Sequence, residues 1–83
     1  MIMTEAEAQK IVQQLKSGKR FITRFQEDEW GIDYLGNGRF RHWSRQGVFA
    51  VKESSDEVDE AAIINLLGKY DYEIIKTRLR KAT

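Results

Sequence analysis

The stretch Glu29–Arg45, EWGIDYLGNGRFRHWSR, decides the fold, because it has the pattern of two β-strands that meet at a glycine-rich turn. On both sides of the turn, apolar or aromatic residues alternate with polar ones, as in strands that are buried on one face. The turn Gly36-Asn37-Gly38 contains residues that tolerate positive φ, and we expect Gly38 to take the left-handed position. The stretch is therefore predicted to form an antiparallel hairpin.

The register of this hairpin follows from keeping each face of the sheet uniform. A two-residue turn at Asn37-Gly38 places Tyr34 opposite Arg41 and mixes core and charged side chains on one face. A three-residue loop places core side chains on one face and charged side chains on the other. In this register the ring of Trp43 covers Gly31. The second register is predicted, with the pairs Tyr34–Phe40, Ile32–His42, Asp33–Arg41 and Gly31–Trp43.

Strand-like alternation continues on both sides of the hairpin. We expect four strands near residues 19–26, 29–35, 39–45 and 47–53, arranged as an antiparallel meander. A tight turn at Glu27-Asp28 is predicted to pair Phe25 with Trp30 and Phe21 with Tyr34. A turn at Gln46-Gly47 is predicted to pair Ser44 with Phe49 and His42 with Val51.

Helices are predicted before and after the strands. Thr4 and Glu7 form a capping-box pattern, and apolar residues then recur at helical spacing as far as Gly18. Residues 54–57, SSDE, offer N-caps for a second helix that ends at Gly68. The last segment, 70–82, fits a helix after an Asp71 cap and also alternates like a strand, and we favour the helix.

Together these elements predict one α+β domain spanning residues 1–83, a four-stranded antiparallel β-meander with N-terminal and C-terminal helices packed on one face. The helices are expected to cover the inner face, because their apolar stripes need a partner. That face would contain Phe21, Phe25, Trp30, Ile32, Tyr34, Phe40, Phe49 and Val51. We expect Trp30 and Phe49 to be mostly buried and Trp43 to be exposed on the other face.

The other, outer face of the sheet is predicted to be basic. Asp33 is expected to be its only carboxylate. Trp and Arg are the residues most enriched at the energetic centres of protein interfaces. The candidate partner-binding residues on this face are Arg20, Arg24, Arg39, Arg41, Trp43, Arg45 and Lys52.

Charge is distributed unevenly along the chain, although the formal net charge is only +1. The stretch 54–68 has four carboxylates and no Lys or Arg. The C-terminal end is basic, with Lys69, Lys76, Arg78, Arg80 and Lys81. We interpret these runs as solvated faces that match the dipoles of helix ends.

No motif in the sequence points to catalysis. His42 is the single histidine and cysteine is absent, so no classical zinc site can form, and we expect no metal and no cofactor. Gly36-Asn37-Gly38 is a hairpin tip and not a phosphate-binding loop that opens a helix. We therefore expect no catalytic residues and no enzymatic activity.

The expected function is a small protein–protein interaction domain, such as an adaptor, inhibitor or assembly subunit, that binds an acidic protein through the outer face. The alternative is nucleic-acid binding by the same Arg and Trp residues. The low net charge and the acidic residues 56–60 argue against it. Without cysteine, leader or transmembrane run, the chain is expected to be cytoplasmic and not membrane-bound.

Overall fold

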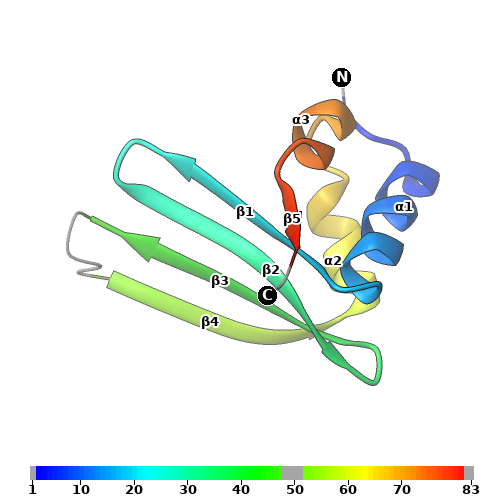
Figure 1. The fold of residues 1–83 in the computed structure, drawn as a ribbon, viewed down its shortest axis with the longest axis horizontal. Coiled ribbons are helices and arrows are strands. Elements are labelled where there is room, and N and C mark those ends of the chain that lie inside the picture. Colours follow the sequence, from blue (N-terminus) through cyan, green and yellow to red (C-terminus); the bar gives the residue numbers. More distant parts are fainter. Residues whose placement is uncertain (1, 48–51, 82–83) are drawn as a thin grey trace.

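The computed structural model describes residues 2–47 and 52–81 and shows an α+β fold with one antiparallel sheet (Figure 1). The elements follow the order α1 (Glu5–Lys16), β1 (Lys19–Phe25), β2 (Asp28–Gly36), β3 (Arg39–Gln46), β4 (Lys52–Asp59), α2 (Glu60–Leu67), α3 (Tyr72–Lys76) and β5 (Leu79–Lys81). The sheet has five strands and not the expected four, in the order β4-β3-β2-β1-β5. Within the described ranges, no helix has the length and apolar character needed to cross a membrane.

One cluster of buried apolar side chains joins the helices to the sheet. Phe21, Ile32 and Phe40 are fully buried on the inner face, as predicted. Trp30 is only partly buried, while Phe49 and Val51 lie outside the described residues. The helices contribute Ala8, Ile11, Val12 and Leu15 from α1, Ile63 and Leu67 from α2, and Ile75 from α3.

Helix α1 begins where the sequence predicts. The backbone N–H of Glu7 donates to Thr4 Oγ1 at 3.2 Å, and the N–H of Thr4 donates to Glu7 Oε1 at 2.9 Å. This reciprocal capping box satisfies two N–H groups that have no partner inside the helix. The helix then places one apolar stripe on the core.

The hairpin of β2 and β3 has the predicted register. The observed partners include Tyr34–Phe40, Asp33–Arg41 and Gly31–Trp43, together with Ile32–His42. The loop is a tight turn at Asn37 and Gly38, which have φ of 54° and 73°, combined with a bulge between Tyr34 and Gly36. The extra residue in the bulge restores the pairing that a three-residue loop was expected to give.

Trp43 covers Gly31, but it is not the exposed residue that the sequence suggested. Only 9% of its surface is accessible. A Cβ atom built on Gly31 would lie 2.6 Å from Trp43 Cζ2 and 2.4 Å from the carbonyl oxygen of Phe21. The ring therefore packs on the bare backbone of β2, and position 31 has no room for a side chain.

The β1–β2 register differs from the prediction by two residues. The turn is at Gln26 and Glu27, so Phe21 pairs with Ile32, and Phe25 pairs with Asp28. Gln26 adopts a φ of 58°, a conformation for which the sequence offers no glycine. A shift of two residues does not exchange the faces of a strand, so Phe21 and Ile32 stay on the inner face as predicted.

The predicted helix start at 54–57 is wrong, and the fourth strand continues past its predicted end at 53, while residues 48–51 of the predicted strand lie outside the described residues. Strand β4 spans Lys52–Asp59, and Ser44 pairs with Ser54 instead of Phe49. Helix α2 starts only after Asp59, whose Oδ1 accepts the N–H of Ala62 at 2.9 Å. Ser, Asp and Glu favour caps over strands, but here the cross-strand pairing of residues 54–57 with β3 outweighs that local preference.

The C-terminal segment 70–82 has a pattern that fits both a helix and a strand, and its described residues form one of each. Asp71 caps the short helix α3, accepting from the N–H of Glu73 at 2.8 Å. The chain then forms β5, which pairs with β1 and adds the fifth strand to the sheet. The helix we favoured therefore covers only the first part of 70–82.

Candidate partner-binding surface

The outer face contains five of the predicted arginines and more carboxylates than expected. The β3–β4 register differs from the predicted one by an odd number of residues, so it exchanges the faces of β4. Glu53, Glu57 and Asp59 now pair with Arg45, Arg41 and Arg39. Lys52 pairs with Gln46 and belongs to the opposite face, which removes it from the predicted set. Asp33 is therefore not the only carboxylate on the outer face.

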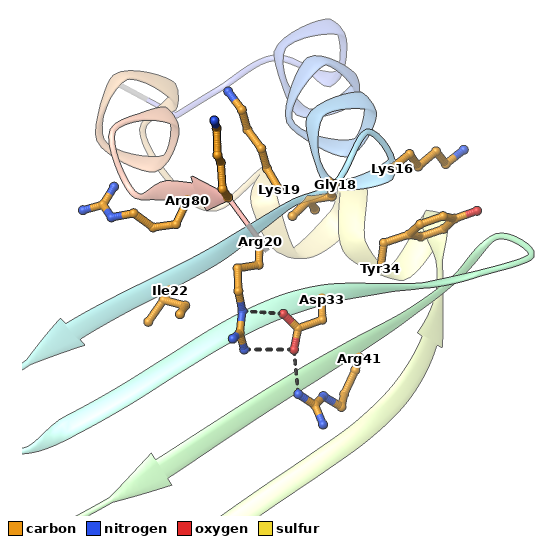
Figure 2. A pocket seen from close by; sticks show the side chains of 11 residues that line it. Lys16, Gly18, Lys19, Arg20, Ile22, Asp33, Tyr34, Arg41 and Arg80 are labelled. Atoms are coloured by element: carbon orange, nitrogen blue, oxygen red, sulfur yellow. Dashed lines mark hydrogen bonds and ion pairs between the residues drawn. The ribbon is translucent and has the colours of Figure 1, made fainter. Parts of the chain in front are cut away.

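Asp33 is shared by two arginines from neighbouring strands (Figure 2). Arg41 Nη2 donates to Asp33 Oδ2 at 2.6 Å, and Arg20 Nη2 donates to the same oxygen at 3.2 Å. Arg20 Nε lies 2.8 Å from Oδ1, an ion-pair contact whose angles fall short of a hydrogen bond. The Asp33 side chain is 17% exposed, so this group is partly shielded from solvent.

The remaining predicted arginines also have carboxylate partners. Arg24 Nε donates to Glu29 Oε2 at 2.7 Å, and Arg45 Nη1 lies 3.7 Å from Glu29 Oε1. Arg45 also approaches Glu53 at 3.4 Å, and Arg39 Nε donates to Glu57 Oε2 at 3.2 Å. Alternating charges thus cross the sheet from strand to strand, and the centre of the outer face is close to neutral.

Trp43 lies within this charged network and not above it. The guanidinium carbons of Arg20 and Arg45 each lie 5.9 Å from the centroid of its ring. Its indole Nε1 is buried and has no hydrogen-bond partner among residues 2–47 and 52–81. Trp43 therefore packs the outer face together, and its ring is not free for a partner to contact.

A basic hollow of about 540 Å³ lies where the end of α1 meets β1, β2 and β5 (Figure 2). Ile22 and Tyr34 contribute apolar surface to its wall, and Asp33 is the one carboxylate among the described residues that line it. Its six cationic residues are Lys16, Lys19, Arg20, Arg41, Arg80 and Lys81. The basic hollow therefore shares Arg20 and Arg41 with the predicted surface and adds four cations that the prediction lacked.

Three of these six cations have partners of opposite charge. Arg20 and Arg41 bind Asp33, as described above. Lys16 forms an ion pair and hydrogen bond with Glu60, which raises the pKa of Lys16 above its ordinary value. These three residues line the hollow, but their carboxylate partners offset much of the positive electrostatic potential that they would otherwise contribute.

The other three cations, on β1 and β5, have no carboxylate partner within the described part of the chain. Lys19 Nζ donates to the amide oxygen of Gln14 at 3.0 Å. Arg80 Nη1 donates to the carbonyl oxygens of Thr77 and Leu79 at 2.9 and 3.1 Å. For Lys81, the described residues supply neither a hydrogen bond nor an ion pair. Among residues 2–47 and 52–81, nothing neutralises the positive charge of these three side chains.

The register of β1 and β5 places cations opposite one another in two pairs. Lys19 lies opposite Lys81 on the face of Phe21, and Arg20 lies opposite Arg80 on the outer face. Like charges placed directly across two strands destabilise a sheet. Because proteins tolerate such local conflicts mainly where function requires them, this pairing marks the basic hollow as the candidate site.

Reasoning from sequence misses Lys19, Arg80 and Lys81. The signal was present as the basic run at the C-terminus, but it acquires a location only when β5 pairs with β1. Within the described ranges, no three His, Asp or Glu side chains are grouped so that they could hold a metal ion. No protein-family model matches this chain, and no curated protein or solved structure is similar enough to match it.

Proposed function

We propose that this protein is a non-enzymatic binding module that holds an acidic segment of a protein partner in the basic hollow. The observation that carries the proposal is the pairing of like charges across β1 and β5, Lys19 with Lys81 and Arg20 with Arg80. The two pairs point to opposite faces of the sheet, because neighbouring residues of a strand alternate, so a carboxylate beside either pair would relieve the repulsion within that pair. Binding of an acidic segment is therefore favoured by its attraction to these cations, and also because it reduces the repulsion between like charges that destabilises the free protein.

The composition of the wall fits a peptide with both charged and apolar side chains. Ile22 and Tyr34 offer apolar surface beside the cations, so an acidic segment could also bury carbon atoms. Arg20 and Arg41 are partly fixed by Asp33, and they present guanidinium edges that can bind carboxylates in pairs. The hollow thus combines cations that Asp33 holds in place with cations that have no carboxylate partner among the described residues.

An acidic protein segment suits this surface better than a nucleic acid. A phosphate backbone that continued across the sheet would meet the carboxylates Glu53, Glu57 and Asp59 of β4. Trp43, the aromatic residue at the centre of the outer face, is 9% exposed and offers little ring surface for base stacking. Both features limit favourable contacts with a nucleic acid to the basic hollow, which is too small to follow an extended phosphate backbone.

The test uses a fluorescein-labelled peptide of eight Asp and Glu residues, titrated with protein at low salt and followed by anisotropy. The variant Arg80→Ala/Lys81→Ala removes two hollow cations. Arg24→Ala/Arg39→Ala is the matched control, because it removes the same charge from paired positions on the same sheet. We expect the first variant to weaken binding roughly tenfold and the control to weaken it less than about twofold.

Equal loss in both variants would contradict the proposal, because it would show attraction to overall charge and not to the basic hollow. A labelled single-stranded oligonucleotide provides the second arm of the test. If it binds at 150 mM salt more tightly than the peptide, with affinity falling steeply as salt rises, nucleic-acid binding replaces the proposal. If the peptide is preferred at that salt, the proposal stands.

A further inference from the structure

The two edges of the sheet differ in length and in regularity. Strand β5 has three residues, whereas β4 has eight, Lys52–Asp59, and pairs only with β3 (Figure 1). All eight residues of β4 keep one register with β3, without a bulge. At an antiparallel edge, alternate residues direct their N–H and C=O groups away from the sheet. Strand β4 therefore presents a long, straight row of backbone groups able to bind another strand.

The usual structural protections of an edge are absent from β4. The chain contains no proline, and the side chains from Lys52 to Glu57 are all exposed. What β4 does carry is negative charge, with Glu53, Asp56, Glu57 and Asp59 against a single Lys52. Charge is a recognised means of discouraging unwanted edge pairing.

This charge disfavours pairing with a second copy of the chain. If two copies of β4 paired about a two-fold axis to extend one sheet, residues opposite each other would share a face of that sheet. The two registers that pair the most residues are then centred on Ser55 and on Asp56. The first places Glu53 against Glu57 twice, and the second places Asp56 against itself. Both registers are repulsive.

The same charge favours a basic strand. Glu53 and Glu57 lie on the outer face and are more than half exposed. Arg45 Nε lies 3.4 Å from Glu53 Oε1, and Arg39 Nε donates to Glu57 Oε2 at 3.2 Å, yet both carboxylates stay largely exposed to solvent. A neighbouring strand with Lys or Arg at alternate positions would place its cations beside these exposed carboxylates.

We propose that β4 binds an extended basic segment of another protein, which adds a sixth strand to the sheet. Backbone hydrogen bonds would supply affinity, and Glu53 and Glu57 would select cations at alternate positions of the segment. This interface is separate from the basic hollow, so it stands or falls independently of the acidic partner proposed above.

The probe is a labelled eight-residue peptide that alternates Lys or Arg with Thr or Val. Two further peptides carry N-methyl groups on every second amide, one on the odd-numbered and the other on the even-numbered residues. Glu53→Gln/Glu57→Gln is the test variant, and Glu5→Gln/Glu73→Gln is a control with the same change of charge. We expect binding by the unmethylated peptide, loss with at least one methylated peptide, and roughly tenfold weaker binding in the test variant only.

Two outcomes would overturn the inference. If both methylated peptides bind as well as the parent, attraction is electrostatic and no strand is added. If the protein alone forms dimers that the Glu53→Gln/Glu57→Gln change strengthens or leaves intact, a second copy occupies the edge. The variant Arg80→Ala/Lys81→Ala should bind the basic peptide unchanged, which separates this result from a failure of the hollow.

Discussion

The centre of the outer face and the basic hollow beside it are built from the same residue type but differ in what opposes each charge. In the centre, Arg24, Arg39 and Arg45 face carboxylates on neighbouring strands. In the hollow, Lys19 lies opposite Lys81, and Arg80 lies opposite Arg20, which itself binds Asp33. The paired arginines of the centre bridge neighbouring strands, whereas Lys19, Arg80 and Lys81 have no carboxylate partner among the described residues and leave charge for a partner. Strand register, and not composition, makes the difference.

The largest effect expected within this comparison is on Trp43, the residue around which the neutral centre is packed. Trp43→Ala removes a side chain that is 9% exposed and leaves a gap over Gly31. We expect it to lower the free energy of unfolding by about 3 kcal/mol. Urea denaturation measures this, and a loss below about 1 kcal/mol would show that the centre does not depend on the ring.

Gly31→Ala tests the same contact from the other strand. The new Cβ would lie too close to Trp43 and to the carbonyl of Phe21, so we expect a loss of about 2 kcal/mol. In a Trp43→Ala background the added loss should be smaller, because one of the two clashes is gone. Additive losses in the double variant would contradict the packing of the ring on Gly31.

Asp33→Asn converts part of the neutral centre into additional free charge at the hollow. It removes the carboxylate shared by Arg20 and Arg41. We expect stability to fall by about 1 kcal/mol while the acidic peptide binds several-fold more tightly. Opposite changes of stability and affinity distinguish the two roles. Weaker peptide binding by folded Asp33→Asn protein would mean that Asp33 orients the arginines for the ligand.

The smallest effect on stability is expected in the hollow itself. Arg80→Ala and Lys81→Ala each remove one of two like charges that face each other across β1 and β5. We expect unfolding free energies within about 0.5 kcal/mol of the unmodified protein. Thermal denaturation at low salt, where surface charge effects are largest, checks this. A loss above about 1 kcal/mol at either position would identify it as structural.

The parts of the fold that local chemistry determines were predictable from sequence. The β2–β3 register followed from the glycine-rich turn and from the need to cover Gly31 with Trp43. The capping box at Thr4 and the N-cap at Asp71 could likewise be predicted, because each depends only on residues within one turn of helix.

The parts that depend on distant pairing were not predictable. Residues 54–57 resemble a helix start, and it is their pairing with β3 that holds them in a strand. That error removed Glu53 and Glu57 from the outer face and made it look uniformly basic. Strand β5 has only three residues, so its pattern is too short to locate the basic hollow without β1 beside it.

The most direct test of the central claim is an amide NMR titration of the protein with the eight-residue acidic peptide. The account predicts that chemical-shift changes concentrate at Gly18, Lys19, Arg80 and Lys81, around the basic hollow. The amides of Ser44 and Ser54, at the far end of the sheet, should be nearly unaffected. Changes centred on Trp43, Ser44 and Arg45, with no response at β5, would contradict the claim and return the binding site to the centre of the outer face.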